Sequence, residues 1–75
     1  MELEKFIIDF ADQFDDTDPE MITADTEFRS LDEWGSLIGF SVIAMTKVKY
    51  GKTLTGAEIR SCSTVRDLFN LIDAK

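Results

Sequence analysis

The stretch Leu31-Asp32-Glu33-Trp34-Gly35-Ser36-Leu37 joins a long polar loop to the most apolar segment of this 75-residue chain. Apolar residues after Ser36 fall on two stripes at helical spacing: Leu37, Phe40, Ala44 and Val48 on one, and Ile38, Val42, Ile43 and Met45 on the other. This pattern predicts a helix over residues 36–50, followed by Gly51 as a helix-ending glycine. Its apolar cover exceeds what a small bundle has to bury, so one stripe is left for a partner or a ligand.

Before this junction, the sequence predicts one amphipathic helix and a long ordered loop. Apolar residues at i, i+3, i+4, i+7 and i+11 indicate a helix over residues 2–15: Leu3, Phe6, Ile7, Phe10 and Phe14. The turn-forming residues of 15–19, which include the only proline, end it. No period continues through residues 21–35, yet this loop holds apolar side chains that should enter the core: Met21, Ile22, Phe28, Leu31 and Trp34.

After the junction, a short turn at residues 55–60 leads to a last helix. Ser63 and Thr64 cap that helix, with Asp67 completing a capping box, and its apolar stripe is Val65, Leu68, Phe69 and Ile72. No strand pattern competes. The predicted fold is therefore all-α: a small antiparallel four-helix bundle of three main helices and one short helix, in a single domain over residues 1–75.

The composition excludes several classes of function. Histidine is absent and Cys62 is the only cysteine, so no Cys/His zinc site, internal disulfide or His-assisted nucleophile is expected. The net charge of −7 disfavours nucleic acid as a partner, and no apolar stretch is long enough to span a bilayer. We therefore expect a cytoplasmic monomer that is not an enzyme and holds no metal.

Taken one by one, the candidate residues have simple structural explanations. Ser36 is most simply a helix N-cap, although a serine at a helix start also suits a phosphate-linked group, because unpaired amides and the positive helix dipole lie beside it. Trp34 anchors the loop by packing rather than stacking on a ligand. Cys62 is a small buried hydrophobe. The acidic stretch 15–20 does not begin an EF-hand calcium loop, because Met21 stands where the loop needs a glycine.

Taken together, these elements resemble an acyl carrier protein over nearly the whole chain. The likeness lies in the first helix, the loop Thr23-Ala24-Asp25-Thr26-Glu27-Phe28, the junction 31–37 and the final helix start Ser63-Thr64-Val65-Arg66-Asp67-Leu68. The family's attachment motif is Asp-Ser-Leu, often preceded by Trp. Trp34, Ser36 and Leu37 match it, whereas Gly35 stands at the aspartate position.

The resemblance implies that Ser36 receives 4′-phosphopantetheine from coenzyme A through a phosphopantetheinyl transferase. The arm would then carry acyl groups as thioesters to acyl-transferring or acyl-ligating enzymes of fatty acid, polyketide or related biosynthesis. The expected partner contacts are Trp34, Gly35, Leu37, Phe40 and Lys47, with core membership the alternative for Phe40. The apolar excess of the helix over residues 36–50 would line a cavity for the acyl chain.

Two departures from the family point to a specialised carrier. Gly35 removes a carboxylate that the family uses toward the transferase, and residues 36–50 contain Lys47 and Lys49 but no acid, where family members are usually acidic. The cognate enzymes should then present a less basic or partly acidic docking face. The alternative is an unmodified carrier-like helical module that binds a protein through the same helix.

Overall fold

The first helix, α1, is shorter than its apolar stripe suggests. A computed structural model describes all residues from Met1 to Lys75 and places α1 at Leu3–Ala11, not over residues 2–15. The amides of Gln13 and Phe14 donate to the carbonyls of Phe10 and Ala11, three residues earlier, which is not the α-helical pattern. The next three amides, of residues 15–17, donate to the carboxylate of Glu33 instead of to a helical carbonyl. Phe14 is nevertheless buried, as the stripe predicts.

The long connection contains two short 3₁₀ helices, η1 (Pro19–Met21) and η2 (Phe28–Ser30). Ile22 and Phe28 enter the core as predicted, but the prediction for Met21 is wrong, because its side chain is 64% exposed. Pro19 starts a turn capped by the carboxylate of Asp18, and this turn directs Met21 outward and the following Ile22 inward.

The second helix, α2, spans Ser36–Tyr50, as predicted. Gly51 ends it in the left-handed conformation, with φ of +68°, and its amide bonds the Lys47 carbonyl. The buried side of α2 is formed by Ile38, Val42, Met45 and Thr46. The apolar stripe of Leu37, Phe40, Ala44 and Val48 is exposed. The predicted excess of apolar surface on this helix is therefore confirmed.

Two further helices complete the chain. Residues predicted as a turn form the helix α3, Gly56–Arg60, because Thr55 and Glu58 make a capping box that was not predicted. The helix α4, Val65–Asp73, begins with the predicted capping box of Thr64 and Asp67.

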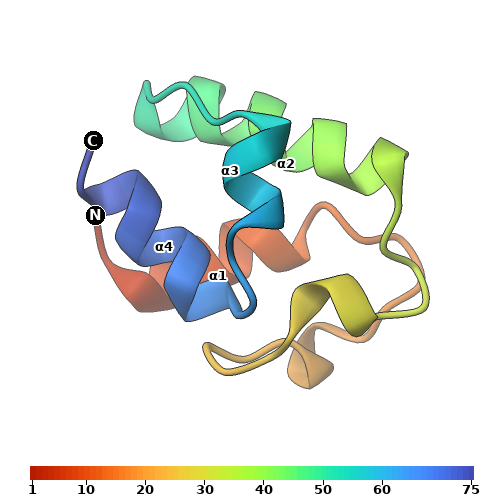
Figure 1. Cartoon of the computed structure of the whole chain (residues 1–75). Helices are drawn as coiled ribbons and strands as arrows, with labels where there is room; N and C mark the ends of the chain where they lie inside the picture. Colours follow the sequence, from red (N-terminus) through yellow and green to blue (C-terminus); the bar gives the residue numbers. More distant parts are fainter.

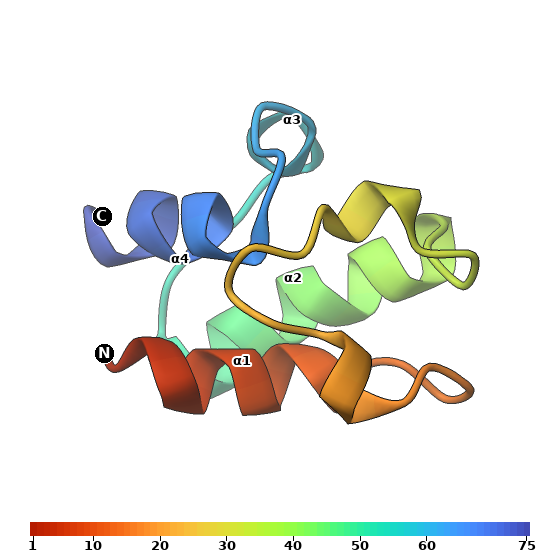
Figure 2. The same ribbon diagram turned by 90° about the horizontal axis from the view of Figure 1, so that it is seen from below.

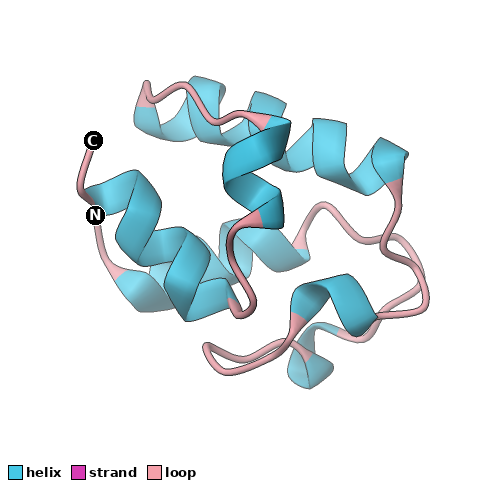
Figure 3. Ribbon diagram, in the orientation of Figure 1, coloured by secondary structure: helices cyan, strands magenta, loops and turns pink.

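The helices pack around a core rich in phenylalanine. Figures 1 and 2 show α1 running in the opposite direction to α2 and α4, with α3 crossing between α2 and α4, and Figure 3 shows no strand. Phe6, Phe10 and Phe28 are fully buried, as are Val42, Val65, Leu68 and Ile72. The all-α prediction is confirmed. Both termini lie at one end of the molecule, and the start of α2 lies at the other (Figures 1 and 2).

One carboxylate lies inside the fold where α1 meets α2. Asp9 is 2% exposed and accepts a 2.5 Å hydrogen bond from the phenol of Tyr50. The ammonium groups of Lys49 and Lys5 lie 3.4 Å and 3.5 Å from its oxygens. The Tyr50 bond, with help from Lys49 and Lys5, lowers the pKa of Asp9 despite burial. Burial and the Asp9 carboxylate raise the pKa of Tyr50 well above its ordinary value.

Candidate functional site

Ser36 is the first residue of α2 and its side chain is exposed. The prediction that Ser36 caps the helix is wrong. Gly35 is the last non-helical residue, with extended φ and ψ of −173° and −172°, and the first helical bond runs from the Gly39 amide to the Gly35 carbonyl at 2.9 Å. Ser36 therefore lies one position inside the helix, and its hydroxyl is not used as a cap.

The beginning of α2 offers unused hydrogen-bond donors. Because the first helical bond is donated by Gly39, the amides of Ser36, Leu37 and Ile38 have no partner within the helix. No side chain caps them and no acidic residue lies in the first turn. These donors and the positive end of the helix dipole favour a negatively charged group next to the Ser36 hydroxyl.

Gly35 is not required by the local backbone. Its extended conformation is open to any residue, and a Cβ at this position would meet no atom within 4 Å. Glycine at this position thus reflects neither a steric nor a conformational demand of this fold.

Trp34 fastens the loop to the core just before Ser36, which confirms its predicted packing role. Its ring lies 5.0 Å from that of Phe28 in an edge contact, and 6.4 Å and 6.3 Å from those of Phe10 and Phe14. The residue is only half-buried, and its outer edge borders a cleft next to Gly39. Contact of Trp34 with a partner remains a prediction.

Glu33 holds the same junction from the other side. Its carboxylate accepts hydrogen bonds from the amides of Asp15, Asp16 and Thr17 at 2.7, 3.0 and 2.9 Å, and from the Thr17 hydroxyl at 2.7 Å. The Thr17 hydroxyl and these amides lower the pKa of Glu33. The loop before Ser36 is thereby tied to the end of α1.

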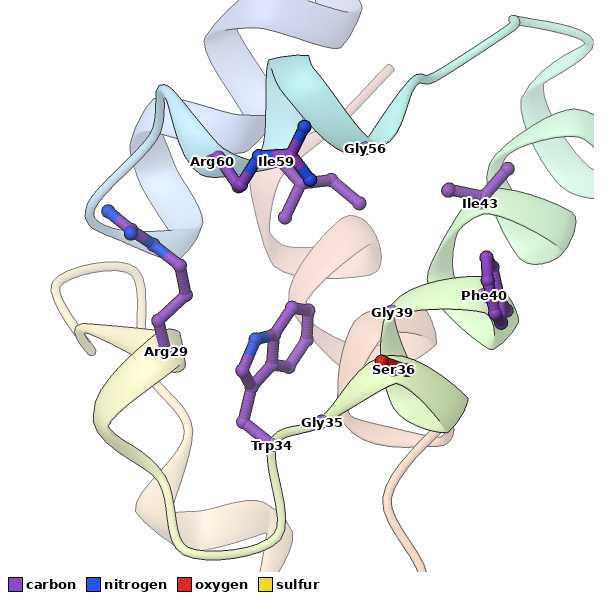
Figure 4. A pocket seen from close by; sticks show the side chains of 10 residues that line it. All are labelled: Arg29, Trp34, Gly35, Ser36, Gly39, Phe40, Ile43, Gly56, Ile59 and Arg60. Atoms are coloured by element: carbon purple, nitrogen blue, oxygen red, sulfur yellow. The ribbon is translucent and has the colours of Figure 1, made fainter.

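Ser36 borders an open cleft of about 390 Å³ between α2 and α3 (Figure 4). Its apolar surface comes from Phe40 and Ile43 on α2, Ile59 on α3, and Trp34. Of the predicted site residues, the structure brings Trp34, Gly35, Ser36 and Phe40 to this cleft; Leu37 and Lys47 do not line it.

Two arginines, which the sequence analysis did not single out, also line the cleft. Arg29 follows Phe28 on η2, and Arg60 is the last residue of α3. In Figure 4 their guanidinium groups lie across the cleft from α2, with the Trp34 ring between Arg29 and Ser36. No sequence pattern links these arginines, since their proximity depends on how α3 packs beside the loop.

The outward face of α2 carries the apolar stripe that begins at Leu37. Leu37, Phe40 and Val48 are 76%, 70% and 83% exposed, and Ala44 is exposed between them. Core membership for Phe40 is therefore wrong. Lys47 is exposed and makes no ion pair, whereas Lys49 is engaged with Asp9.

Other candidate groups show no sign of chemistry. Cys62 is buried, as predicted, and burial raises the pKa of its thiol. Nowhere do three or more potential metal-ligating side chains gather. None of the helices combines the length and the apolar character that crossing a membrane requires.

No protein-family model, curated protein or solved structure matches this chain.

Proposed function

We propose that the protein is a specialised acyl carrier, modified on Ser36 with 4′-phosphopantetheine and used by partner enzymes of fatty acid, polyketide or related biosynthesis in the cytoplasm. In the loading step, the Ser36 oxygen forms a new bond to the phosphorus that bears pantetheine in coenzyme A. The pyrophosphate linkage breaks, adenosine 3′,5′-bisphosphate leaves, and the serine proton passes to the transferase. The domain itself catalyses nothing.

The observation that carries the proposal is the setting of Ser36. Its hydroxyl is exposed at the first position of α2, beside three amides without helical partners. A phosphodiester on this oxygen would lie at the positive end of the helix, where negative charge is stabilised. A cleft opens beside the same residue, where a flexible arm could place its load.

The arrangement of the chain also agrees with what the resemblance implies. Three longer helices and one short helix follow the predicted order, and the long loop between α1 and α2 is fixed by Glu33 and Trp34 immediately before Ser36. Such anchoring would give a transferase a rigid target. We therefore include the carrier-like bundle in the proposal.

Partner enzymes would dock on the exposed stripe of α2. Leu37, Phe40 and Val48 expose large apolar side chains that contribute little to the core, and such surfaces are typical of protein contacts. Lys47 is the unpaired charge beside them, since Lys49 is held by Asp9. A partner with an apolar groove and nearby acidic side chains would fit this face.

The test is the intact mass of the protein after incubation with coenzyme A, Mg²⁺ and a broad-specificity phosphopantetheinyl transferase. We expect wild type to gain the mass of one phosphopantetheine and Ser36→Ala to gain none. Ser41→Ala, a serine elsewhere on α2, is the matched control and should gain the same mass as wild type. Absence of any gain, also with transferases from the source organism, would refute the carrier function.

The second candidate is an unmodified helical module that binds a protein through α2. Gly35 at the aspartate position favours it, as does the exposed apolar stripe, which needs no cofactor to act. The two candidates differ in one measurable property. A carrier gains phosphopantetheine on Ser36, whereas a module gains none, binds its partner unmodified and keeps that binding in Ser36→Ala.

A further inference from the structure

The distribution of paired and unpaired cations around the molecule is uneven. Four cationic side chains make ion pairs: Lys5 and Lys49 with Asp9, Arg66 with Asp25, and Lys75 with Glu58. Lys52 donates to the carbonyls of Ile72 and Lys75. The cations without a carboxylate or carbonyl for their terminal groups are Lys47, Arg29 and Arg60, and the two arginines line the same cleft.

The two guanidinium groups are available to a ligand. Arg29 donates its Nε–H to the Cys62 carbonyl at 3.1 Å, which positions the side chain and leaves its terminal nitrogens free. Arg60 makes no ion pair, and its terminal nitrogen lies over Gly56, only 3.4 Å from where a Cβ would sit. In a chain with 15 acidic residues, two unpaired arginines beside one cleft suit an anion that is not part of the chain.

The position of the arginines separates them from the attachment point. Figure 4 shows Ser36 on the α2 side and the guanidinium groups on the side of α3 and η2. A phosphodiester on Ser36 already has the free amides at the start of α2. The arginines are therefore placed for the far end of a group that crosses the cleft along Phe40, Ile43 and Ile59.

We infer that the cleft holds an acyl group that ends in a carboxylate, with its apolar part between α2 and α3 and its terminal carboxylate on Arg29 and Arg60. This inference rests on the proposed function, because the arm on Ser36 delivers the acyl group. The guanidinium fork matches a carboxylate geometrically. Both arginines are exposed, so each contact with the carboxylate is weak. Because the arm tethers the acyl group to Ser36, the carboxylate has an effective concentration of about millimolar at the cleft, and weak contacts are enough to hold it there.

The experiment compares two arms that differ only at the far end. Amide-linked coenzyme A analogues, one ending in an adipoyl group and one in a hexanoyl group, are loaded onto wild type and onto the double variant Arg29→Gln/Arg60→Gln. Arg66→Gln is the matched control, because Arg66 pairs with Asp25 and does not line the cleft. The terminal adipoyl carbon is ¹³C-labelled and titrated by NMR, and the amide signals of Gly39 and Gly56 report contact with the cleft.

We expect the adipoyl carboxyl on wild type and on Arg66→Gln to titrate with a pKa lower by about 1 or more than on the double variant. The amides of Gly39 and Gly56 should shift with the adipoyl arm and less with the hexanoyl arm.

Equal carboxyl pKa values in wild type and double variant would overturn the inference. So would equal amide shifts with both arms, which would mean a cleft for plain apolar chains. The ³¹P signal of the phosphodiester on Ser36 is also compared in protein whose arm carries no acyl group. A change of this signal in the double variant would show that the arginines bind the phosphodiester instead, and would overturn the inference.

Failure of the proposed function is visible separately, as an absence of mass gain on Ser36. In that case the same adipoyl and hexanoyl arms are attached through the thiol of Ser36→Cys, which reacts selectively because Cys62 is buried and its pKa is raised. The carboxylate preference of the cleft is then confirmed or overturned by the same titration, while the carrier function stands refuted.

Discussion

Glu33 and Thr17 are joined by two hydrogen bonds to one carboxylate oxygen, at 2.9 Å from the Thr17 amide and 2.7 Å from its hydroxyl. The other oxygen of Glu33 accepts from the Asp15 amide. A single side chain thus holds the turn after α1 and fixes the loop that leads to Ser36. The contribution of Glu33 to stability depends on its charge, because a carboxylate accepts all four hydrogen bonds whereas a protonated acid accepts fewer.

Replacing Glu33 by Gln should loosen residues 15–17 and lower stability at neutral pH. Because the pKa of Glu33 is lowered below 4.5, its stabilising contribution is present above that value and is lost as the pH falls through the lowered pKa. Amide hydrogen exchange at residues 15–17 and urea unfolding at neutral and acidic pH measure both effects. Asp32→Asn, which removes an exposed carboxylate without hydrogen bonds, should change neither. A Glu33→Gln protein with unchanged exchange at these amides would contradict the assigned role.

Tyr50 should titrate well above its ordinary pKa of 10.0, because burial and Asp9 both disfavour the phenolate. Since the folded pKa is raised, the associated stability is present below 10.0 and is lost as the pH rises above it. Tyr50 is the only tyrosine, so phenolate absorbance reports it directly. Asp9→Asn should lower this pKa, and Tyr50→Phe should cost about 1–2 kcal/mol in the free energy of unfolding. Titration of folded wild type near the ordinary value would be the contrary result.

Gly35→Asp should fold without strain and, under the proposed carrier function, accelerate loading of Ser36. The position is open to a side chain, and an aspartate there caps α2 better than glycine, by a few tenths of a kcal/mol. It also restores the carboxylate that the resemblance assigns to transferase contacts. Initial rates of mass gain compare the variant with wild type and with Gly35→Ala, which adds a Cβ without a carboxylate. Equal rates for aspartate and alanine would show that the carboxylate is not used.

Replacement of glycine by alanine should change the free energy of unfolding in opposite directions at Gly51, which ends α2, and at Gly39, which lies within it. Gly51→Ala should lower the free energy of unfolding by about 1–2 kcal/mol, because Gly51 has a φ of +68°. Gly39→Ala should raise it by up to about 1 kcal/mol, because the position is helical and a Cβ would contact Trp34 at an ordinary 3.8 Å. Chemical unfolding of both variants tests this pair, and effects of the same sign would disprove it.

Periodicity and capping patterns predicted α2 and α4, whereas the predicted first helix was too long and α3 was predicted as a turn. The limits of α2 and the box of Thr64 and Asp67 depend on neighbours in sequence, which is why they could be recognised. The turn at residues 15–17 that follows α1 could not be recognised, because it is held by Glu33, far along the chain. The burial of Asp9 and the position of Arg29 and Arg60 on one cleft also arise from packing between elements. Ser36 and Trp34 could be singled out because their motif is continuous, whereas the cleft beside them has no continuous signature.

The two chain ends lie together, away from the start of α2 (Figures 1 and 2). A protein held by either end on a resin, a sensor chip or a fused neighbour would therefore present Ser36 outward. The attachment would obstruct neither the cleft nor an enzyme approaching along Leu37 and Phe40. Immobilised protein is thus suited to measuring transferase and partner binding directly, and several copies in one fused array could each keep an accessible serine.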